Sequence, residues 1–127
     1  MDTYVDQLMS SPVETVRANT PLRAAAGELL AEDVGALVVV DDDIVAGILT
    51  ATDFVRFVDA QRSVDDATVA DAMRTDVVTT TPDTEVRDIA ATMLDHRIDH
   101  VPVLDSTDDL VGMLSTTDLA AHLRSRW

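Results

Sequence analysis

The fold is decided by two stretches of the same design: Gly47-Ile48-Leu49-Thr50-Ala51-Thr52-Asp53 and Gly112-Met113-Leu114-Ser115-Thr116-Thr117-Asp118. In each stretch a short apolar segment is followed by a hydroxyl residue, and an aspartate lies three residues after that hydroxyl residue. The apolar segment is typical of a buried strand, and the hydroxyl with its spaced acid is typical of a helix start. The chain therefore contains the same strand-to-helix junction twice.

The two junctions belong to a duplication that covers almost the whole chain of 127 residues. An offset of 64 aligns the halves without a gap as far as Asp41, and one extra residue in the acidic turn that follows moves the offset to 65. Turns tolerate such insertions. We therefore expect an α+β module of two pseudo-symmetric repeats, residues 1–62 and 63–127. The matched pairs include Val5/Val69, Met9/Met73, Val13/Val77, Thr20/Thr84, Leu30/Leu94 and Val39/Val103.

Each repeat has the same predicted order of elements: helix, strand, helix, strand, strand, helix. Thr20 and Thr84 each precede a helical apolar face, which predicts that they are the N-caps of the long helices. Acidic turns separate the last two strands of each repeat, as expected for hairpins. The other expected elements are short helices at 5–9 and 69–73 and strands at 13–16, 77–80, 37–40, 101–104, 44–49 and 110–114.

Acidic residues dominate the charge. The chain has 24 acids and 9 bases, all of them arginine, and a formal net charge of -15. A field this negative repels nucleic acid and anionic membrane, so neither is an expected partner. The composition is typical of proteins from salt-loving archaea, in which concentrated salt screens the repulsion. An acidic face made for a basic partner is the alternative.

The sequence lacks the residues that several classes of functional site require. The absence of cysteine excludes disulfides, zinc–thiolate sites and cysteine nucleophiles. There is no glycine-rich phosphate loop and no Ser–His–Asp set that the repeats would bring together, so we do not expect an enzyme. The longest apolar runs, such as 36–40, are too short to span a membrane, and the acidic N-terminus is unlike a secretory signal. We expect a cytoplasmic protein.

With these features the sequence resembles tandem CBS domains. The resemblance rests on the duplicated element order, on Val-x-Thr in the first strand, on Val101-Pro102-Val103 and on the two quoted junctions, and it covers residues 5–127. It implies a regulatory module that binds an adenosine-containing ligand (AMP, ADP, ATP, NAD or S-adenosylmethionine) between the repeats, without an obligatory cofactor. It also implies a homodimer and an unidentified regulated partner. The candidate interface residues are Leu29, Phe54, Phe57, Met93 and Leu123.

The resemblance also implies two ligand sites at corresponding positions of the repeats, each with an aspartate that accepts the ribose hydroxyls, although the two sites differ in their other residues. For the apolar residues, ordinary core packing is the alternative role. His100, when protonated, would contact a phosphate, whereas the first repeat has Gly35-Ala36 there. A nucleotide is therefore expected at the second site first. The first site would contain Thr50, Thr52, Asp53, Met73, Val77 and Val78, and the second Met9, Val13, Glu14, His100, Ser115, Thr117 and Asp118.

Simpler explanations exist for several of these features. Capping boxes alone account for the hydroxyl–aspartate pairs, so a ligand-free dimerisation scaffold is the alternative function. His96 and His100 are four residues apart, but no third ligand is evident and no metal site is expected. The acidic turns lack the glycine and distal glutamate of a calcium loop. Trp127 is expected to pack at an edge or a subunit contact.

Overall fold

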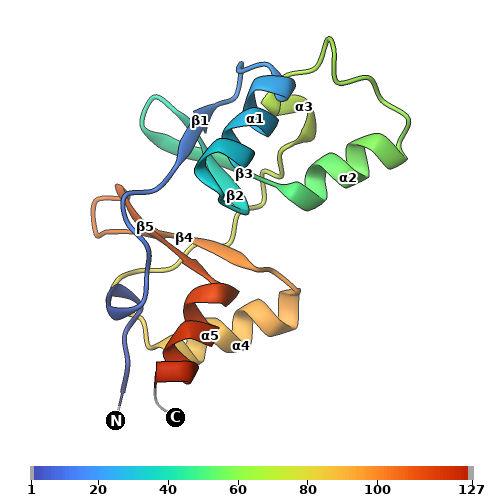
Figure 1. Cartoon of the computed structure of the whole chain (residues 1–127). Coiled ribbons are helices and arrows are strands. Elements are labelled where there is room, and N and C mark those ends of the chain that lie inside the picture. The colour runs from blue at the N-terminus through green and yellow to red at the C-terminus, as the bar shows by residue number, and fades with distance from the viewer. Residues whose placement is uncertain (1, 126–127) are drawn as a thin grey trace. The chain divides into compact units, whose positions relative to one another are not determined.

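A computed structural model describes the backbone of residues 2–125 and the side chains of residues 2–124 (Figure 1). Trp127 lies outside the described residues. The α+β class is confirmed, with small sheets packed against helices. The elements in chain order are η1 (Val5–Gln7), β1 (Thr15–Arg17), α1 (Leu22–Glu32), β2 (Ala36–Asp41), β3 (Ile44–Thr50), α2 (Ala51–Asp59), α3 (Val69–Ala72), α4 (Val86–His96), β4 (His100–Leu104), β5 (Leu110–Ser115) and α5 (Thr116–Ser125).

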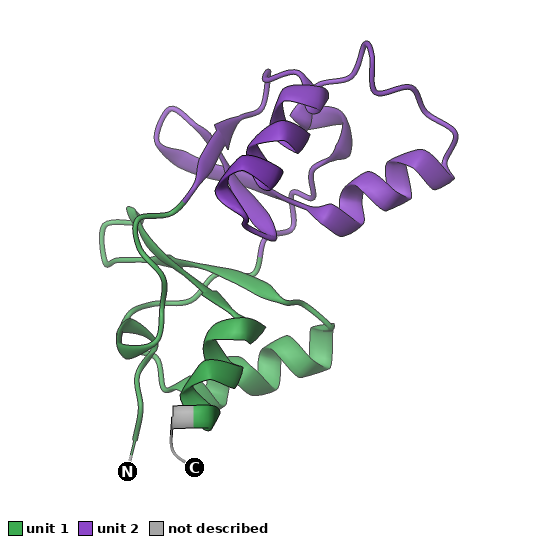
Figure 2. Cartoon of the chain, in the orientation of Figure 1, with its two compact units in different colours: residues 1–13, 78–127 green, residues 14–77 purple. Residues whose placement is uncertain are grey.

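The chain forms two compact units, and each unit takes a segment from the other sequence repeat (Figure 2). Unit 1 contains residues 1–13 and 78–127, and unit 2 contains residues 14–77. The exchanged segments are held by backbone hydrogen bonds: the N–H of Val5 donates to Thr84 at 3.0 Å, and the N–H of Val69 donates to Thr20 at 2.9 Å. The compact units therefore have different boundaries from the repeats at 1–62 and 63–127.

The same exchange displaces the predicted helix caps. Pro21 and Glu85, not Thr20 and Thr84, are the N-caps of α1 and α4, and neither side chain makes a capping hydrogen bond. The threonine carbonyls accept the backbone N–H groups of the exchanged segments. Because the chain is extended at this pairing, each helix begins one residue later than the sequence predicted.

The sheets differ between the units because of one proline. Unit 2 has a three-stranded sheet, in which β1 is parallel to β2 and β2 is antiparallel to β3; the described residues of unit 1 form a two-stranded sheet, β4–β5. The predicted strand at 77–80 is wrong: Thr80 makes a single bridge to Val103. At the start of β1 the N–H of Val38 donates to Glu14. The aligned residue is Pro102, which has no N–H to donate, so the matching first hydrogen bond cannot form and the pairing is limited to the bridge at Thr80.

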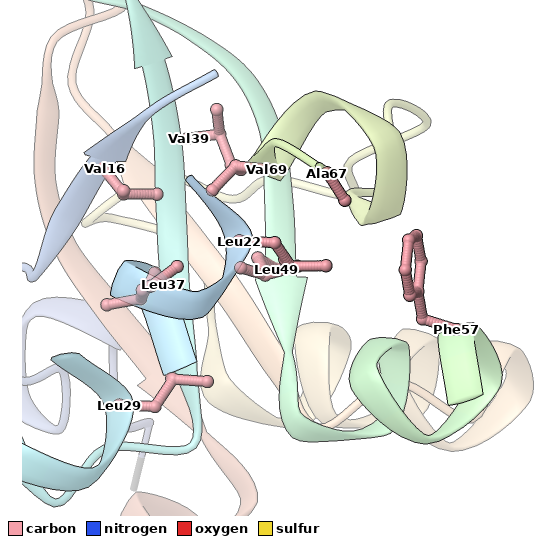
Figure 3. Packing of buried hydrophobic residues seen from close by; sticks show 10 residues of the cluster. Val16, Leu22, Leu29, Leu37, Val39, Leu49, Phe57, Ala67 and Val69 are labelled. Atoms are coloured by element: carbon pink, nitrogen blue, oxygen red, sulfur yellow. The ribbon is translucent and has the colours of Figure 1, made fainter. Parts of the chain in front are cut away.

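Each unit has its own apolar core. In unit 2 the buried face of α1, made by Leu22, Ala25 and Leu29, packs with the strands and α3 (Figure 3). In unit 1 the core contains Val5 of η1, Ile89 and Met93 of α4 and the strand residues Val101, Val103 and Leu114.

These cores correct part of the predicted dimer surface. Leu29, Phe57 and Met93 are buried inside the units and cannot form an outer face. The next residues along the same helices point outward instead, because consecutive residues of an amphipathic helix lie on different faces. The exposed apolar helix residues are Leu30, Val55, Val58, Leu94 and Leu123.

Two glycines of unit 2 provide a test of the packing. A Cβ at Gly47 of β3 would lie 2.7 Å from the carbonyl oxygen of Arg74 and 2.8 Å from the sulfur of Met73. Ile48 and Arg74 exchange backbone hydrogen bonds of 2.9 and 3.0 Å, so the backbone cannot easily retreat. We expect Gly47→Ala to destabilise the protein by about 2 kcal/mol.

The matched control is Gly27→Ala on α1, where an added Cβ meets nothing within 4 Å. Alanine is the better helix former, so this change should stabilise the protein by about 0.5–1 kcal/mol. Urea denaturation of both variants measures the two effects. Equal shifts of the same sign would contradict the close approach at Gly47.

Candidate functional site

The first junction is a capping box at the start of α2. The Oδ2 of Asp53 accepts the N–H of Thr50 at 2.8 Å and the Oγ1–H of Thr50 at 3.1 Å. Both residues are buried, with exposed fractions of 8% for Thr50 and 4% for Asp53. This geometry follows from the sequence. Strand β3 ends at Thr50, which is the N-cap of α2, and the acid three residues later lies near the positive end of the helix.

Two arginines enclose the other oxygen of Asp53. The Oδ1 atom lies 3.3 Å from Nη1 of Arg56 on the next turn of α2 and 3.5 Å from Nε of Arg74. Arg74 follows α3, and its backbone is paired with Ile48 of β3. The Asp53 carboxylate is therefore occupied on both sides by groups of its own unit.

The second junction repeats the cap at the start of α5. The Oδ2 of Asp118 accepts the N–H of Ser115 at 2.9 Å and its Oγ–H at 3.1 Å, and Ser115 Oγ accepts the N–H of Asp118 at 3.2 Å. The other oxygen of Asp118 meets a neutral group: Oδ1 accepts the Oγ–H of Ser10 at 3.1 Å. Asp118 is half-buried. This carboxylate is held in place, and within the part of the chain that the structure describes it forms no salt bridge with an arginine.

Ser10 and Arg74 were missed by the sequence interpretation. They occupy equivalent positions, since the offset of 64 places Ser10 on Arg74. Both lie beside their unit's junction aspartate, and both pair through the backbone with the strand that precedes it, Ser10 with Met113 and Arg74 with Ile48. The repeat alignment was the available signal: a neutral and a cationic residue at one aligned position predict unequal sites.

His100 begins β4 and lies opposite Ser115 of β5. The side chain is half-buried. Burial lowers the pKa of His100 below its ordinary value, while Asp99 and Asp118 act in the opposite direction. The neutral imidazole is therefore favoured near pH 7, and the protonated form that a phosphate contact requires is disfavoured.

The remaining predicted residues divide between the units. Met9 packs against Gly112, and Met73 packs against Gly47, so each methionine lies beside the strand that leads to its junction. Thr52 and Thr117 are exposed on the first turns of α2 and α5. Val13, Val77 and Val78 are half-buried. Unit 2 contains Glu14, Thr50, Thr52, Asp53, Met73 and Val77, and unit 1 contains Met9, Val13, Val78, His100, Ser115, Thr117 and Asp118.

Glu14 and Val78 lie at the unit boundaries. Glu14 belongs to unit 2 and its carbonyl accepts the N–H of Val38, whereas its predicted site aspartate, Asp118, belongs to unit 1. Val78 belongs to unit 1 and its predicted partner Asp53 to unit 2. The assignment of Glu14 and Val78 to these sites stays a prediction.

In residues 2–125 no group of three or more histidines and carboxylates could hold a metal ion. Across the same range, no helix combines the length and apolar character that crossing a bilayer requires.

A family model and several known proteins are similar to this chain. The model of the CBS domain matches residues 5–60 and 69–125. An uncharacterized 17.7 kDa protein of Acidianus ambivalens is 36% identical over 124 residues, which is 97% of this chain and 74% of that protein. A structure of a protein with CBS domains from Burkholderia ambifaria is 32% identical, with a TM-score of 0.89 over 95% of this chain and 93% of that one.

A further solved structure contains ligands. The CBS domain pair of protein MJ0100, in complex with 5'-methylthioadenosine and S-adenosyl-L-methionine, is 25% identical to this chain, with a TM-score of 0.92 over 100% of both chains.

Proposed function

The chain belongs to the CBS domain family as a tandem pair, and from that premise we propose that it senses an adenosine-containing ligand at Asp118. The proposal rests on the hydrogen-bond partners of the two oxygens of the Asp118 carboxylate. Its Oδ2 is fixed by the cap, and among the described residues its Oδ1 accepts a hydrogen bond from the neutral hydroxyl of Ser10. A carboxylate held this way can exchange one neutral hydroxyl for the cis-diol of a ribose.

The two junctions are not equivalent in this proposal. A diol at Asp53 would have to compete with two guanidinium groups that already face Oδ1. At Asp118 it displaces a single serine hydroxyl. We therefore expect one ligand per chain, at the second repeat, with Thr117, Ser115 and His100 beside it.

The ligand class follows from charge. The formal net charge of -15 opposes phosphate groups, and the neutral state favoured for His100 does not attract them. We propose a preference for adenosyl ligands without phosphate. The ligands of the MJ0100 pair, 5'-methylthioadenosine and S-adenosyl-L-methionine, are of this kind and support the choice.

Thermal denaturation tests the function directly. The full chain, in concentrated salt, is melted with adenosine, 5'-methylthioadenosine, S-adenosylmethionine, AMP and ATP. A ligand at 100 times its Kd should add about 2.7 kcal/mol to the folded state. Melting temperatures that none of the five compounds changes would favour the alternative, a scaffold that keeps its capping boxes without a ligand.

We further propose that the module transmits binding by self-association and contacts with a separate regulated protein, without catalysis. The outward helix residues Leu30 and Leu94, 84% and 80% exposed, are aligned in the repeats and offer apolar surface that a symmetric dimer could bury. Together with Val55, Val58 and Leu123 they favour a homodimer through helical faces. Salt-loving origin and a cytoplasmic location fit the acidic surface and remain parts of this proposal.

Light scattering after gel filtration measures the association. We expect a dimer of the wild-type chain in concentrated salt and a monomer after Leu30→Asp with Leu94→Asp. Ile44→Asp is the matched control, since Ile44 is 69% exposed on a hairpin and not on a helix. A monomeric wild type, or an equal effect of the control, would contradict the helical interface.

A further inference from the structure

Unit 2 contains a pocket of about 260 Å³ that the adenosyl proposal does not use. It is formed by α2, by α3 and by the residues that follow each helix. Three of the nine arginines of the chain line it together with two aspartates, so the lining is positive within a strongly acidic protein. The lining residues are Asp53, Arg56, Phe57, Ala60, Arg62, Asp71, Ala72 and Arg74.

Most hydrogen-bond donors of these arginines are uncommitted. A guanidinium has five N–H donors. Among the described residues, Arg56 donates to Oδ1 of Asp53 at 3.3 Å, and Arg62 donates to the carbonyl of Asp71 at 3.1 Å. The Nε of Arg74 is buried and has no hydrogen-bond partner, although Asp53 Oδ1 lies 3.5 Å away. The terminal nitrogens of Arg74 are left for another acceptor.

The two acids of the lining are already engaged. Oδ2 of Asp53 accepts the N–H of Thr50, and Oδ2 of Asp71 accepts the N–H of Thr68 at 2.9 Å in the cap of α3. Each carboxylate is therefore held at a helix start, where the helix dipole offsets part of its charge. Three guanidinium groups and two carboxylates leave the lining with one excess positive charge to face a ligand.

The arginines are also held in position. The guanidinium of Arg62 lies 4.5 Å from the ring centre of Phe57, a cation–π geometry, and Phe57 is buried. The backbone of Arg74 is fixed by its exchange of hydrogen bonds with Ile48. A preorganised donor set loses less conformational entropy on binding than free surface arginines do.

We propose that this pocket binds a small organic oxyanion, a phosphate or carboxylate attached to an apolar group. The guanidinium forks match both kinds of oxyanion, and Phe57, Ala60 and Ala72 supply an apolar lining for the attached group. The site lies within unit 2 and does not depend on ligand binding at Asp118.

Titration of the full ¹⁵N-labelled chain with phenyl phosphate and with benzoate tests the pocket. The arginine side-chain Nε–H signals are followed at constant ionic strength, and phenol is the uncharged control. We expect saturable shifts of Arg56, Arg62 and Arg74 with at least one anion and none with phenol. The anion that binds more tightly identifies the oxyanion class.

Two variants decide whether the contacts are specific. Arg62→Gln should weaken anion binding about tenfold, as expected for the loss of a charge-assisted contact. Arg17→Gln, at an exposed position of β1, removes the same charge outside the pocket and should leave anion binding unchanged. Absence of saturable shifts with both anions, or equal weakening in the two variants, would overturn the proposal. The backbone amide signals of the same labelled chain report on the other site: adenosine should shift those of Ser115 and Asp118, so failure of one site is distinguishable from failure of the other.

Discussion

Asp118→Ala should abolish the stabilisation of this protein by adenosyl ligands. The Oδ1 of the carboxylate can accept two charge-assisted hydrogen bonds from a ribose diol once Ser10 is displaced, and each such bond is worth about 1.5–3 kcal/mol. Loss of both corresponds to at least about a 100-fold weaker Kd. Isothermal titration with the tightest of the five tested compounds measures the change.

The variant also removes a helix cap, so a control must separate stability from binding. Asp71→Ala is that control, because Asp71 accepts the N–H and Oγ1–H of Thr68 at 2.9 and 3.3 Å in the same arrangement as Asp118 with Ser115. Each variant should lose about 1 kcal/mol of folding free energy. Only Asp118→Ala should lose the ligand. Retention of the wild-type Kd by Asp118→Ala would remove the basis of the proposed site.

The junctions themselves could be predicted from the sequence because they are local. A hydroxyl at the N-cap and an acid three residues later satisfy each other within one helical turn, so residue spacing is enough to place Thr50 with Asp53 and Ser115 with Asp118. The paired hairpins followed in the same way from acidic turns, where Asp42 and Asp43 adopt positive φ angles of 50° and 64°.

The exchanged segments could not be predicted in this way. Val5 bonds to Thr84 and Val69 to Thr20, contacts between residues far apart in the chain that leave no periodic signature. Because of these contacts, the N-caps of α1 and α4 differ from the predicted ones, and Ser10 and Arg74 lie beside the junction aspartates. The loss of the strand at 77–80 was readable in principle, since Pro102 replaces Val38 in the aligned repeat and lacks the required N–H.

The difference between Ser10 and Arg74 predicts opposite roles for the two aspartates. Asp53→Ala should destabilise the protein by about 2–4 kcal/mol. The change removes a cap worth about 1 kcal/mol, and it leaves the buried Nε of Arg74 without its nearby charge. Arg56 and the rest of Arg74 are partly exposed, so solvent limits the electrostatic part of the loss.

Asp53→Asn divides this loss into its two causes. The asparagine oxygen can still accept from Thr50, so the cap survives, but the charge that faces Arg56 and Arg74 is gone. Urea denaturation should place Asp53→Asn between the wild type and Asp53→Ala. In both variants the ligand bound at Asp118 should keep its Kd within about threefold, because among the described residues the partners of Asp53 (Thr50, Arg56 and Arg74) are not shared with Asp118. If Asp53→Ala instead lost the ligand at little cost in stability, the two junctions would be equivalent ribose sites, and the arginines around Asp53 would be phosphate contacts of a nucleotide.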